Sequence, residues 1–208
     1  MKPISKLQFI TTSAALAEQA CMGGIDWIQL RLKDTPYDEF QAIAKEVQAV
    51  CKQFNATFII NDNVSLAFNI HADGVHLGKE DMSPDTARNL MGGNFIIGCT
   101  ANTFEDIAYL SQKPISYIGL GPYRFTATKQ NLSPVLGLQG YRDIYGIIKE
   151  RRINTPPIIA IGGITNNDIP GIMETGIYGV AVSGAISNAH DSTTAAMMLK
   201  NSLFTSQY

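Results

Sequence analysis

Two cationic side chains follow an apolar run in the first quarter of the chain. Gln29, Arg31 and Lys33 alternate with leucines, so an extended backbone directs all three polar side chains to one side. Two neighbouring cations in apolar surroundings need an anion to offset their lost hydration. The pattern therefore favours a site for a phosphorylated ligand. The alternative is a surface turn that Arg31 and Lys33 form with Asp34.

Carboxylates follow two further apolar runs. Asn61-Asp62 comes directly after one run, and Glu80-Asp81 comes soon after the next. Asp62 and Asp81 can share one hard cation, because Mg²⁺ binds one or two carboxylates together with phosphate oxygens and water. The alternatives are that Asp62 caps a helix over residues 64–70 and that Asp81 caps a loop. Glu80 is either a further ligand or a solvent-exposed side chain.

Glycine-bearing turns follow the last two apolar runs, as Gly162-Gly163 and Ser183-Gly184. Glycine allows the backbone to approach a phosphate closely, and the last two loops of a (β/α)8 barrel commonly bind phosphate. A second phosphate site is therefore expected there, although such turns also occur without any ligand. His76 lies inside a run, where a single imidazole is more often a hydrogen-bonded core group than a catalyst.

These residues must be positioned by the apolar runs themselves, which alternate with helix-like segments along the whole chain. The runs are short and rich in β-branched or aromatic residues, as expected of buried parallel strands. Eight strands are predicted: 7–11, 27–32, 57–60, 74–77, 95–99, 117–120, 158–161 and 179–182.

The helix-like segments complete the pattern. Residues 40–51 place apolar side chains on one face, and helix starts are indicated at Pro36, at Ser83-Pro84 and at residues 166–168. Eight strand-helix units in 208 residues predict a single (β/α)8 TIM barrel over residues 1–208. The irregular stretch at about 121–138 is expected to be an active-site loop. A doubly wound open sheet is the second choice, since no G-x-G-x-x-G turn follows the first strand.

Composition excludes several classes of protein. The formal net charge of -2 gives no basic surface for nucleic acid or an anionic membrane. The three cysteines, Cys21, Cys51 and Cys99, are widely spaced in apolar surroundings and are expected to be reduced core residues. No export signal and no membrane-spanning stretch is found, so we expect a cytoplasmic protein that acts on small molecules. Assembly into a homo-oligomer is compatible with the sequence.

Taken in order, these motifs resemble the thiamine phosphate synthase family, also called thiamine phosphate pyrophosphorylase, over nearly the whole chain. The matching segments are Gln29-x-Arg31-x-Lys33, Asn61-Asp62, residues 72–78 with Glu80-Asp81, residues 119–122 with Thr126, Thr128 and Lys129, and residues 160–164.

The resemblance implies two phosphorylated substrates, a hydroxymethylpyrimidine diphosphate and a thiazole phosphate, and Mg²⁺ on Asp62 and Asp81. The residues implied for the pyrimidine diphosphate are Gln29, Arg31, Lys33, Asn61, Lys129 and, on the pyrimidine side, Thr100. Those implied for the thiazole phosphate are Thr126, Thr128 and the backbone of Gly163, Ser183 and Gly184. In this reading Arg31, Lys33 and Lys129 stabilise the charge of the departing diphosphate.

The chain departs from the family pattern at several positions: Leu32 replaces Glu, Lys79 replaces Gln, Thr100 replaces Ser, Asn102 replaces His, and Ser183-Gly184 replaces an apolar-Ser pair. None of these removes an expected ligand, although the last puts side-chain contacts to the thiazole phosphate in doubt. Two other functions remain as alternatives. A thiazole tautomerase would not need the diphosphate and metal residues, and a non-catalytic thiazole or thiamine phosphate binding protein would need neither Asp62 nor Asp81.

Overall fold

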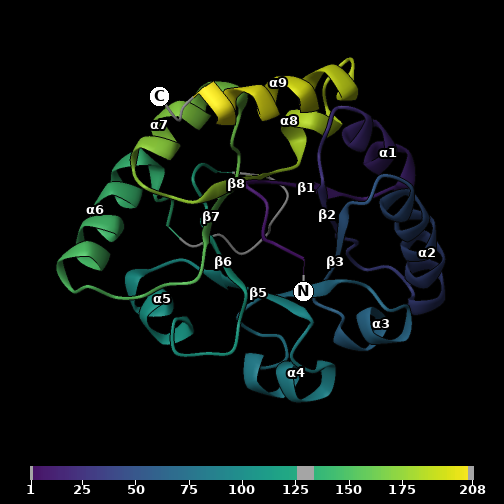
Figure 1. Ribbon diagram of the computed structural model, residues 1–208, viewed down its shortest axis with the longest axis horizontal. Helices are drawn as coiled ribbons and strands as arrows, with labels where there is room; N and C mark the ends of the chain where they lie inside the picture. The colour runs from purple at the N-terminus through teal and green to yellow at the C-terminus, as the bar shows by residue number, and fades with distance from the viewer. Residues whose placement is uncertain (1, 126–133, 206–208) are drawn as a thin grey trace.

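The strands close into a barrel. A computed structural model describes residues 2–125 and 134–205, with side chains as far as Leu203. Within these residues each strand pairs in parallel with the next, and β8 pairs with β1 (Figure 1). The predicted (β/α)8 fold is therefore confirmed. The strands are β1 (Leu7–Thr11), β2 (Trp27–Leu30), β3 (Thr57–Asn61), β4 (Gly74–Leu77), β5 (Ile96–Ala101), β6 (Tyr117–Leu120), β7 (Ile158–Ile161) and β8 (Gly179–Val182).

Three strands have bounds that differ from the prediction, and one of them, β3, ends one residue later than expected, at Asn61. β5 begins one residue later and ends two residues later than expected, and β2 ends at Leu30 rather than at residue 32. The ladder beside β2 ends with the Arg31 amide, which donates to Thr11 O at 3.0 Å. The chain then turns through Asp34, whose φ of 50° is left-handed. The strand alternation therefore reaches Arg31 but not Lys33.

Helices surround the barrel (Figure 1). The predicted starts at Pro36, Ser83-Pro84 and residues 166–168 agree with the structure, and the Ser83 hydroxyl accepts from the Thr86 amide at 3.2 Å. The helices are α1 (Ala14–Met22), α2 (Tyr37–Gln53), α3 (Val64–Asn69), α4 (Pro84–Met91), α5 (Phe104–Leu110), α6 (Gly137–Glu150), the 3₁₀ turn η1 (Asn166–Asp168), α7 (Ile169–Glu174), α8 (Gly184–Ser187) and α9 (Ser192–Thr205).

Strand alternation separates two cores. Side chains on the outer face of the strands pack against the helices in one large apolar cluster, to which Ile28 and Leu30 belong. Side chains on the inner face form a smaller cluster, Trp27, Ile59, Ile96, Tyr117, Ile159 and Ala181. The polar residues Gln29, Asn61 and His76 share the inner face and are also buried. Within the described residues, the strands therefore bury large polar side chains beside apolar ones only in the barrel interior.

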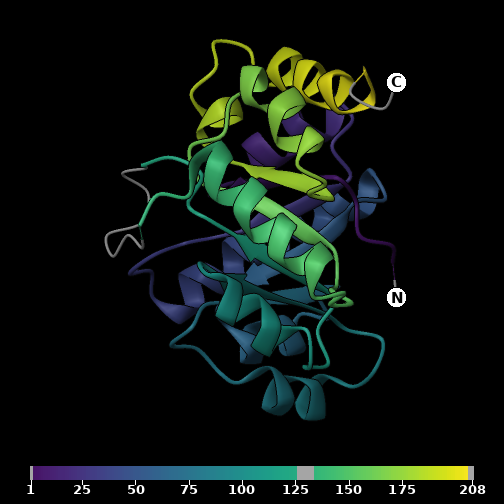
Figure 2. The ribbon, with the colours of Figure 1, turned by 90° about the vertical axis from the view of Figure 1, so that its left-hand side faces the viewer.

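The two ends of the barrel differ. The N-terminal segment lies at one end, where Ile4 packs against the inner cluster and its carbonyl accepts from Tyr178 Oη at 2.7 Å. Figure 2 shows the N-terminus and the described ends of the β6–α6 connection on opposite sides of the barrel. The C-terminal α9 packs beside α1, so helices from both ends of the chain are neighbours (Figure 1). Among the described residues, no helix has the length and apolar character to span a bilayer.

The close contact of β4 with its neighbours depends on a glycine. A Cβ at Gly74 would lie 2.3 Å from Ile96 O, which is backbone and cannot move away. We therefore expect Gly74→Ala to destabilise the fold by several kcal/mol, in the range of severe overpacking. Gly146→Ala is the matched control, because its Cβ meets nothing within 4 Å, and it should raise stability by about 0.5–1 kcal/mol through helix propensity. Urea unfolding of both variants measures these changes, and a Gly74→Ala protein as stable as wild type would contradict the packing.

Candidate active site

A cavity of about 860 Å³ opens at the carboxyl ends of the strands. Its size is in the range of small-molecule sites, and barrel enzymes bind substrates at this end. All eight strands or the loops after them contribute to it. The described lining residues are Ile10, Gln29, Arg31, Asn61, Asp62, His76, Gly78, Lys79, Glu80, Asp81, Thr100, Asn102, Gly121, Pro122, residues 161–165, residues 181–185 and Asn188.

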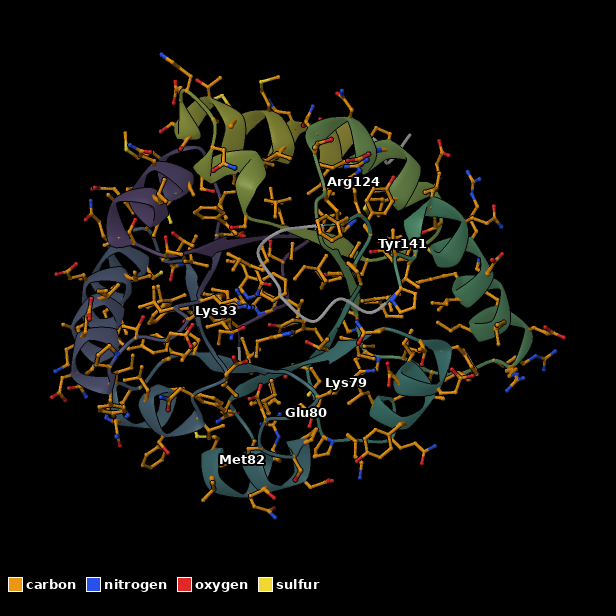
Figure 3. The ribbon with its side chains drawn as sticks, turned by 180° about the vertical axis from the view of Figure 1, so that it is seen from behind. Lys33, Lys79, Glu80, Met82, Arg124 and Tyr141 are labelled. Atoms are coloured by element: carbon orange, nitrogen blue, oxygen red, sulfur yellow. The ribbon has the colours of Figure 1, made fainter. Side chains whose placement is uncertain are left out.

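The cationic side of the cavity contains one of the two predicted strand cations. Gln29 is buried and Arg31 is partly buried, and both line the cavity as the inward alternation predicts. Lys33 is exposed and is not among the described lining residues. It lies two residues beyond the last ladder bond, which the Arg31 amide makes. Figure 3 places Lys33 on the inner side of the helix ring at this mouth. Its role in anion binding therefore stays a prediction.

The carboxylates lie at adjacent strand ends of the same cavity. Asp62 has a left-handed backbone with φ of 63°, and the cap of α3 is Asn63, whose Oδ1 accepts from the Leu66 amide at 2.9 Å. The capping alternative for Asp62 is therefore wrong. Asp81 does cap its loop, since its Oδ2 accepts a hydrogen bond from the Gly78 amide at 2.6 Å. Each carboxylate oxygen can accept more than one partner, so this contact is compatible with a metal ligand.

Glycine turns line the opposite side of the cavity. Gly162 and Gly163 both have left-handed backbones, with φ of 106° and 64°, which non-glycine residues adopt at a cost. Ser183 and Gly184 line the same side at the start of α8. The cavity thus has cations and carboxylates over β2–β4 and bare backbone turns after β7 and β8, an arrangement suited to a ligand pair with two anionic groups.

An ion pair holds the start of the β6–α6 connection against the β7 turn. Arg124 donates to both carboxylate oxygens of Asp168, at 2.8 and 2.9 Å, and to Gly163 O at 2.6 Å. The Arg124 amide also donates to Gly162 O at 2.9 Å. Figure 3 shows Arg124 beside α7, across the mouth from Lys79 and Glu80. A bidentate pair of this kind fixes orientation as well as distance, so it fixes the backbone of the glycine turn.

The floor of the cavity is polar. Thr100 Oγ1 lies 3.0 Å from His76 Nε2, and both residues line the cavity. Cys99 lies beside Thr100 and is buried, and this burial raises the pKa of its thiol to about 12, so it is an inert core group. The expected side chains Thr126, Thr128 and Lys129 lie outside the described residues.

Comparison with known proteins gives the family. The profile described as thiamine monophosphate synthase matches residues 3–186. The chain belongs to the thiamine monophosphate synthase family. The thiamine-phosphate synthase of Phocaeicola vulgatus is 52% identical over 202 residues, which cover 94% of this chain and 97% of that protein. That of Flavobacterium johnsoniae is 46% identical over 206 residues, with 96% and 97% covered. The resemblance drawn from the motifs is confirmed.

A solved structure agrees with the family assignment. Thiamine phosphate pyrophosphorylase from Pyrococcus furiosus superimposes with a TM-score of 0.85 at 29% identity, and the match covers 98% of this chain and 97% of that one. A 3-hexulose-6-phosphate synthase is also similar, with a TM-score of 0.65 at 19% identity and coverage of 96% and 100%. At that identity the second likeness concerns the fold alone.

Some lining residues of this family member were not expected from sequence. Lys79 pairs with Asp106 at 2.6 Å, Asn102 Nδ2 donates to Gly121 O at 2.5 Å, and Asn188 lies beside Gly184. Lys79 and Asn102 stand at two of the departures from the family pattern, and that departure was the available signal. For Asn188 the sequence offers only a polar residue shortly after the last strand.

Acid should weaken the contact between Arg124 and Asp168. Burial raises the pKa of Asp168, but hydrogen bonds from Arg124 and Thr165 outweigh it and lower the pKa to about 2. Because the folded value lies below the unfolded value of about 3.9, the pair stabilises the fold above about pH 4 and this contribution is lost as the pH falls towards 2. Asp168→Asn should therefore lower stability at pH 7, and its gap from wild type should shrink between pH 4 and 2.

Denaturant unfolding at a series of pH values measures that gap. Asp143→Asn is the control, because Asp143 is an exposed carboxylate on α6 that accepts from Gln139 rather than from a cation. A gap between wild type and Asp168→Asn that stayed constant down to pH 2 would contradict the ion pair.

Proposed function

We propose that this cavity joins 4-amino-5-hydroxymethyl-2-methylpyrimidine diphosphate to hydroxyethylthiazole phosphate, giving thiamine phosphate and diphosphate. The chain is a transferase of the thiamine-phosphate synthase kind, as its close relatives over nearly their full length are. One observation supports the assignment of the reaction to this cavity: its two sides suit two different anions, with Arg31 and the carboxylates on one and the glycine turns on the other.

The chemistry requires the control of a leaving group. The bond between the pyrimidine methylene carbon and the diphosphate oxygen breaks, and its electron pair leaves with the diphosphate. The pyrimidine ring stabilises the carbon cation, and the lone pair of the thiazole nitrogen then forms the new carbon–nitrogen bond. No protein nucleophile is needed. The protein must stabilise negative charge as it develops on the diphosphate, and preorganised cations in a site that excludes water do so effectively.

Arg31 is the described side chain best suited to that role. It lies at the end of β2, where its fixed charge and planar donors match phosphate oxygens. Asn61, buried at the end of β3 beside it, adds an amide donor. We assign Gln29 and Thr100 to the pyrimidine half, and Lys33 and Lys129 to the diphosphate by their match to the family motifs.

The donor set fits a magnesium ion. Asp62 and Asp81 supply hard oxygens from adjacent strand ends, and both line the cavity beside Arg31. Two carboxylates, with phosphate oxygens and water, are the usual environment of Mg²⁺. No cluster of three or more His, Cys, Asp or Glu side chains occurs among the described residues, as expected where substrate oxygens complete the coordination. When bound, the ion neutralises charge on the diphosphate.

The thiazole phosphate belongs at the other side. We assign its phosphate to the backbone amides of Gly163, Ser183 and Gly184, and its ring to Thr126 and Thr128. Arg124, held by its ion pair with Asp168, also donates to Gly163 O and so fixes the Gly163 turn before the substrate binds. A preformed turn reduces the entropy lost on binding and directs the thiazole nitrogen towards the methylene carbon.

Three further assignments accompany this function. We propose that residues 1–208 form one barrel domain, in which residues 121–138 make an active-site loop that covers the departing diphosphate. The substrates are small phosphorylated molecules, without nucleic acid or membrane. The protein acts in the cytoplasm, where such phosphorylated intermediates are retained.

The reaction itself is the first test. With Mg²⁺ and both substrates, the purified protein should form thiamine phosphate and one equivalent of diphosphate, which chromatography measures directly. A thiazole tautomerase would convert its thiazole phosphate without diphosphate release, and a binding protein would retain the thiazole phosphate without turnover. A folded sample that gives either of those results would overturn the proposal.

Removing one metal carboxylate or the loop lysine should separate activity from stability. Asp62→Asn keeps a residue type that tolerates the left-handed backbone but removes the charge, and Lys129→Ala removes a cation. Each should lower kcat by about 100-fold or more with little change in melting temperature. Asp85→Asn is the control, since Asp85 is an exposed carboxylate on α4 paired with Lys113. Normal turnover by Asp62→Asn or Lys129→Ala would refute the role given to that residue.

A further inference from the structure

A chain of hydrogen bonds crosses the inside of the barrel below the cavity. Gln29 Nε2 donates to Gln8 Oε1 at 3.3 Å, and Gln8 Nε2 donates to Tyr117 Oη at 3.4 Å. Tyr117 Oη lies 3.0 Å from His76 Nδ1, and His76 Nε2 lies 3.0 Å from Thr100 Oγ1. The two ends of the chain, Gln29 and Thr100, line the cavity, whereas Gln8 and Tyr117 are buried beneath it.

Two strand glycines make room for this series of hydrogen bonds. A Cβ at Gly98 would lie 2.1 Å from Tyr117 Cζ, so the ring occupies the space that a side chain on β5 would fill. A Cβ at Gly119 would lie 3.0 Å from His76 Cε1. Trp27 packs edge-on against Tyr117, with ring centroids 4.8 Å apart at 81°. The tyrosine ring is therefore held on both sides, and its hydroxyl has a fixed place between Gln8 and His76.

The donors and acceptors in this chain determine its direction. An amide nitrogen only donates, so the Tyr117 oxygen accepts from Gln8. The Tyr117 proton is then directed at His76 Nδ1, which must be unprotonated to accept it. A neutral imidazole carries its proton on the other nitrogen, so His76 Nε2 donates to Thr100 Oγ1. The Thr100 hydroxyl proton takes no part in this series of hydrogen bonds and can point into the cavity.

The electrostatics at Tyr117 agree with this direction. Burial is the strongest influence and raises the pKa of its hydroxyl, while hydrogen bonds from the Gln8 and Gln29 side chains act to lower it. A donor lowers the pKa of a phenol by stabilising the phenolate oxygen. Gln8, whose amide nitrogen lies 3.4 Å from the Tyr117 oxygen, therefore acts on it as a donor, and the tyrosine proton remains available for His76.

We propose that Tyr117 and Gln8 are positioning residues that set the polarity of the cavity floor. They hold His76 as the Nε2–H tautomer, so that Thr100 presents a hydroxyl donor to the ligand. The same chain fixes the amide of Gln29 at its other end. This inference rests on the proposed function, in which the pyrimidine half lies against Gln29 and Thr100. The ligand atom facing Thr100 is then an acceptor, such as an aromatic ring nitrogen, and a ring that presents an N–H there is rejected.

The test begins with His76 in the ligand-free protein. Long-range ¹H–¹⁵N NMR correlations of its ring should give the Nε2–H tautomer in wild type, and Tyr117→Phe should increase the population of the Nδ1–H form. In steady-state kinetics the same variant should raise KM for the pyrimidine diphosphate about 3- to 10-fold, the range expected for one lost hydrogen bond. KM for the thiazole phosphate should not change.

Two further variants make the result decisive. Gln8→Met removes the donor to Tyr117 at similar volume and should shift the tautomer and the same KM in the same direction, which keeps the test valid if Tyr117→Phe does not fold. Tyr141→Phe is the matched control, because Tyr141 is also a fully buried tyrosine. Its hydroxyl donates to Leu120 O at 2.9 Å and is not part of the hydrogen-bond series from Gln29 to Thr100. This variant should lose comparable stability with no change in tautomer or KM.

Three results would overturn the proposal: an Nδ1–H tautomer in wild type, an unchanged tautomer and KM in both Tyr117→Phe and Gln8→Met, or equal changes in Tyr141→Phe. The tautomer measurement needs no substrate. It therefore tests the hydrogen-bond chain separately, whereas a wild-type protein that forms no thiamine phosphate would refute the proposed function instead.

Discussion

Closure of the parallel sheet is the constraint on which the rest of this structure depends. Once β8 pairs with β1, every second side chain of each strand is confined to an interior that its own neighbours must fill. A polar group there that finds neither a partner nor a ligand costs about 1–3 kcal/mol, and among the described residues Trp27 Nε1 is the only buried side-chain nitrogen or oxygen atom without a hydrogen-bond partner. Below the cavity the polar residues bond to one another, as Gln8, Tyr117 and His76 do. At the strand ends they line the cavity.

The charges at the mouth follow from the same constraint. A cation such as Arg31 or a carboxylate such as Asp62 is compatible with a strand end, where one side remains open to solvent or substrate, and not with the middle of the barrel. The charged residues that line the cavity therefore lie beyond the carboxyl ends of the strands. In a thiamine-phosphate synthase the cavity must hold two anionic substrates together, and here the glycine turns line the side opposite Arg31.

The departures from the family pattern have structural roles beside this site. Lys79 pairs with Asp106 at the start of α5, and Asn102 bonds to the backbone of Gly121 after β6. Both contacts join the loops of adjacent strands. They hold the walls of the cavity in place, and Thr100, between Lys79 and Asn102 in sequence, lines that cavity.

The sequence by itself determined the eight strands, the starts of three helices and the family, because these depend on local alternation and on motifs that are continuous in the chain. It also placed Arg31 and Gln29 on one inner face. It could not place Lys33, since alternation ends where the ladder beside β2 ends. The sequence left open whether Asp62 binds a metal or caps the helix α3, and only the fold showed that Asn63 is the cap.

The partners of the buried polar groups were decided by tertiary structure alone. Tyr117 meets Gln8 across 109 positions of sequence and His76 across 41, and Arg124 meets Asp168 across 44. Each of these side chains is ordinary in its own segment, so no local pattern marks it. Their contacts exist because closure and strand register bring distant strands to one depth of the barrel, and register depends on the packing of the whole sheet.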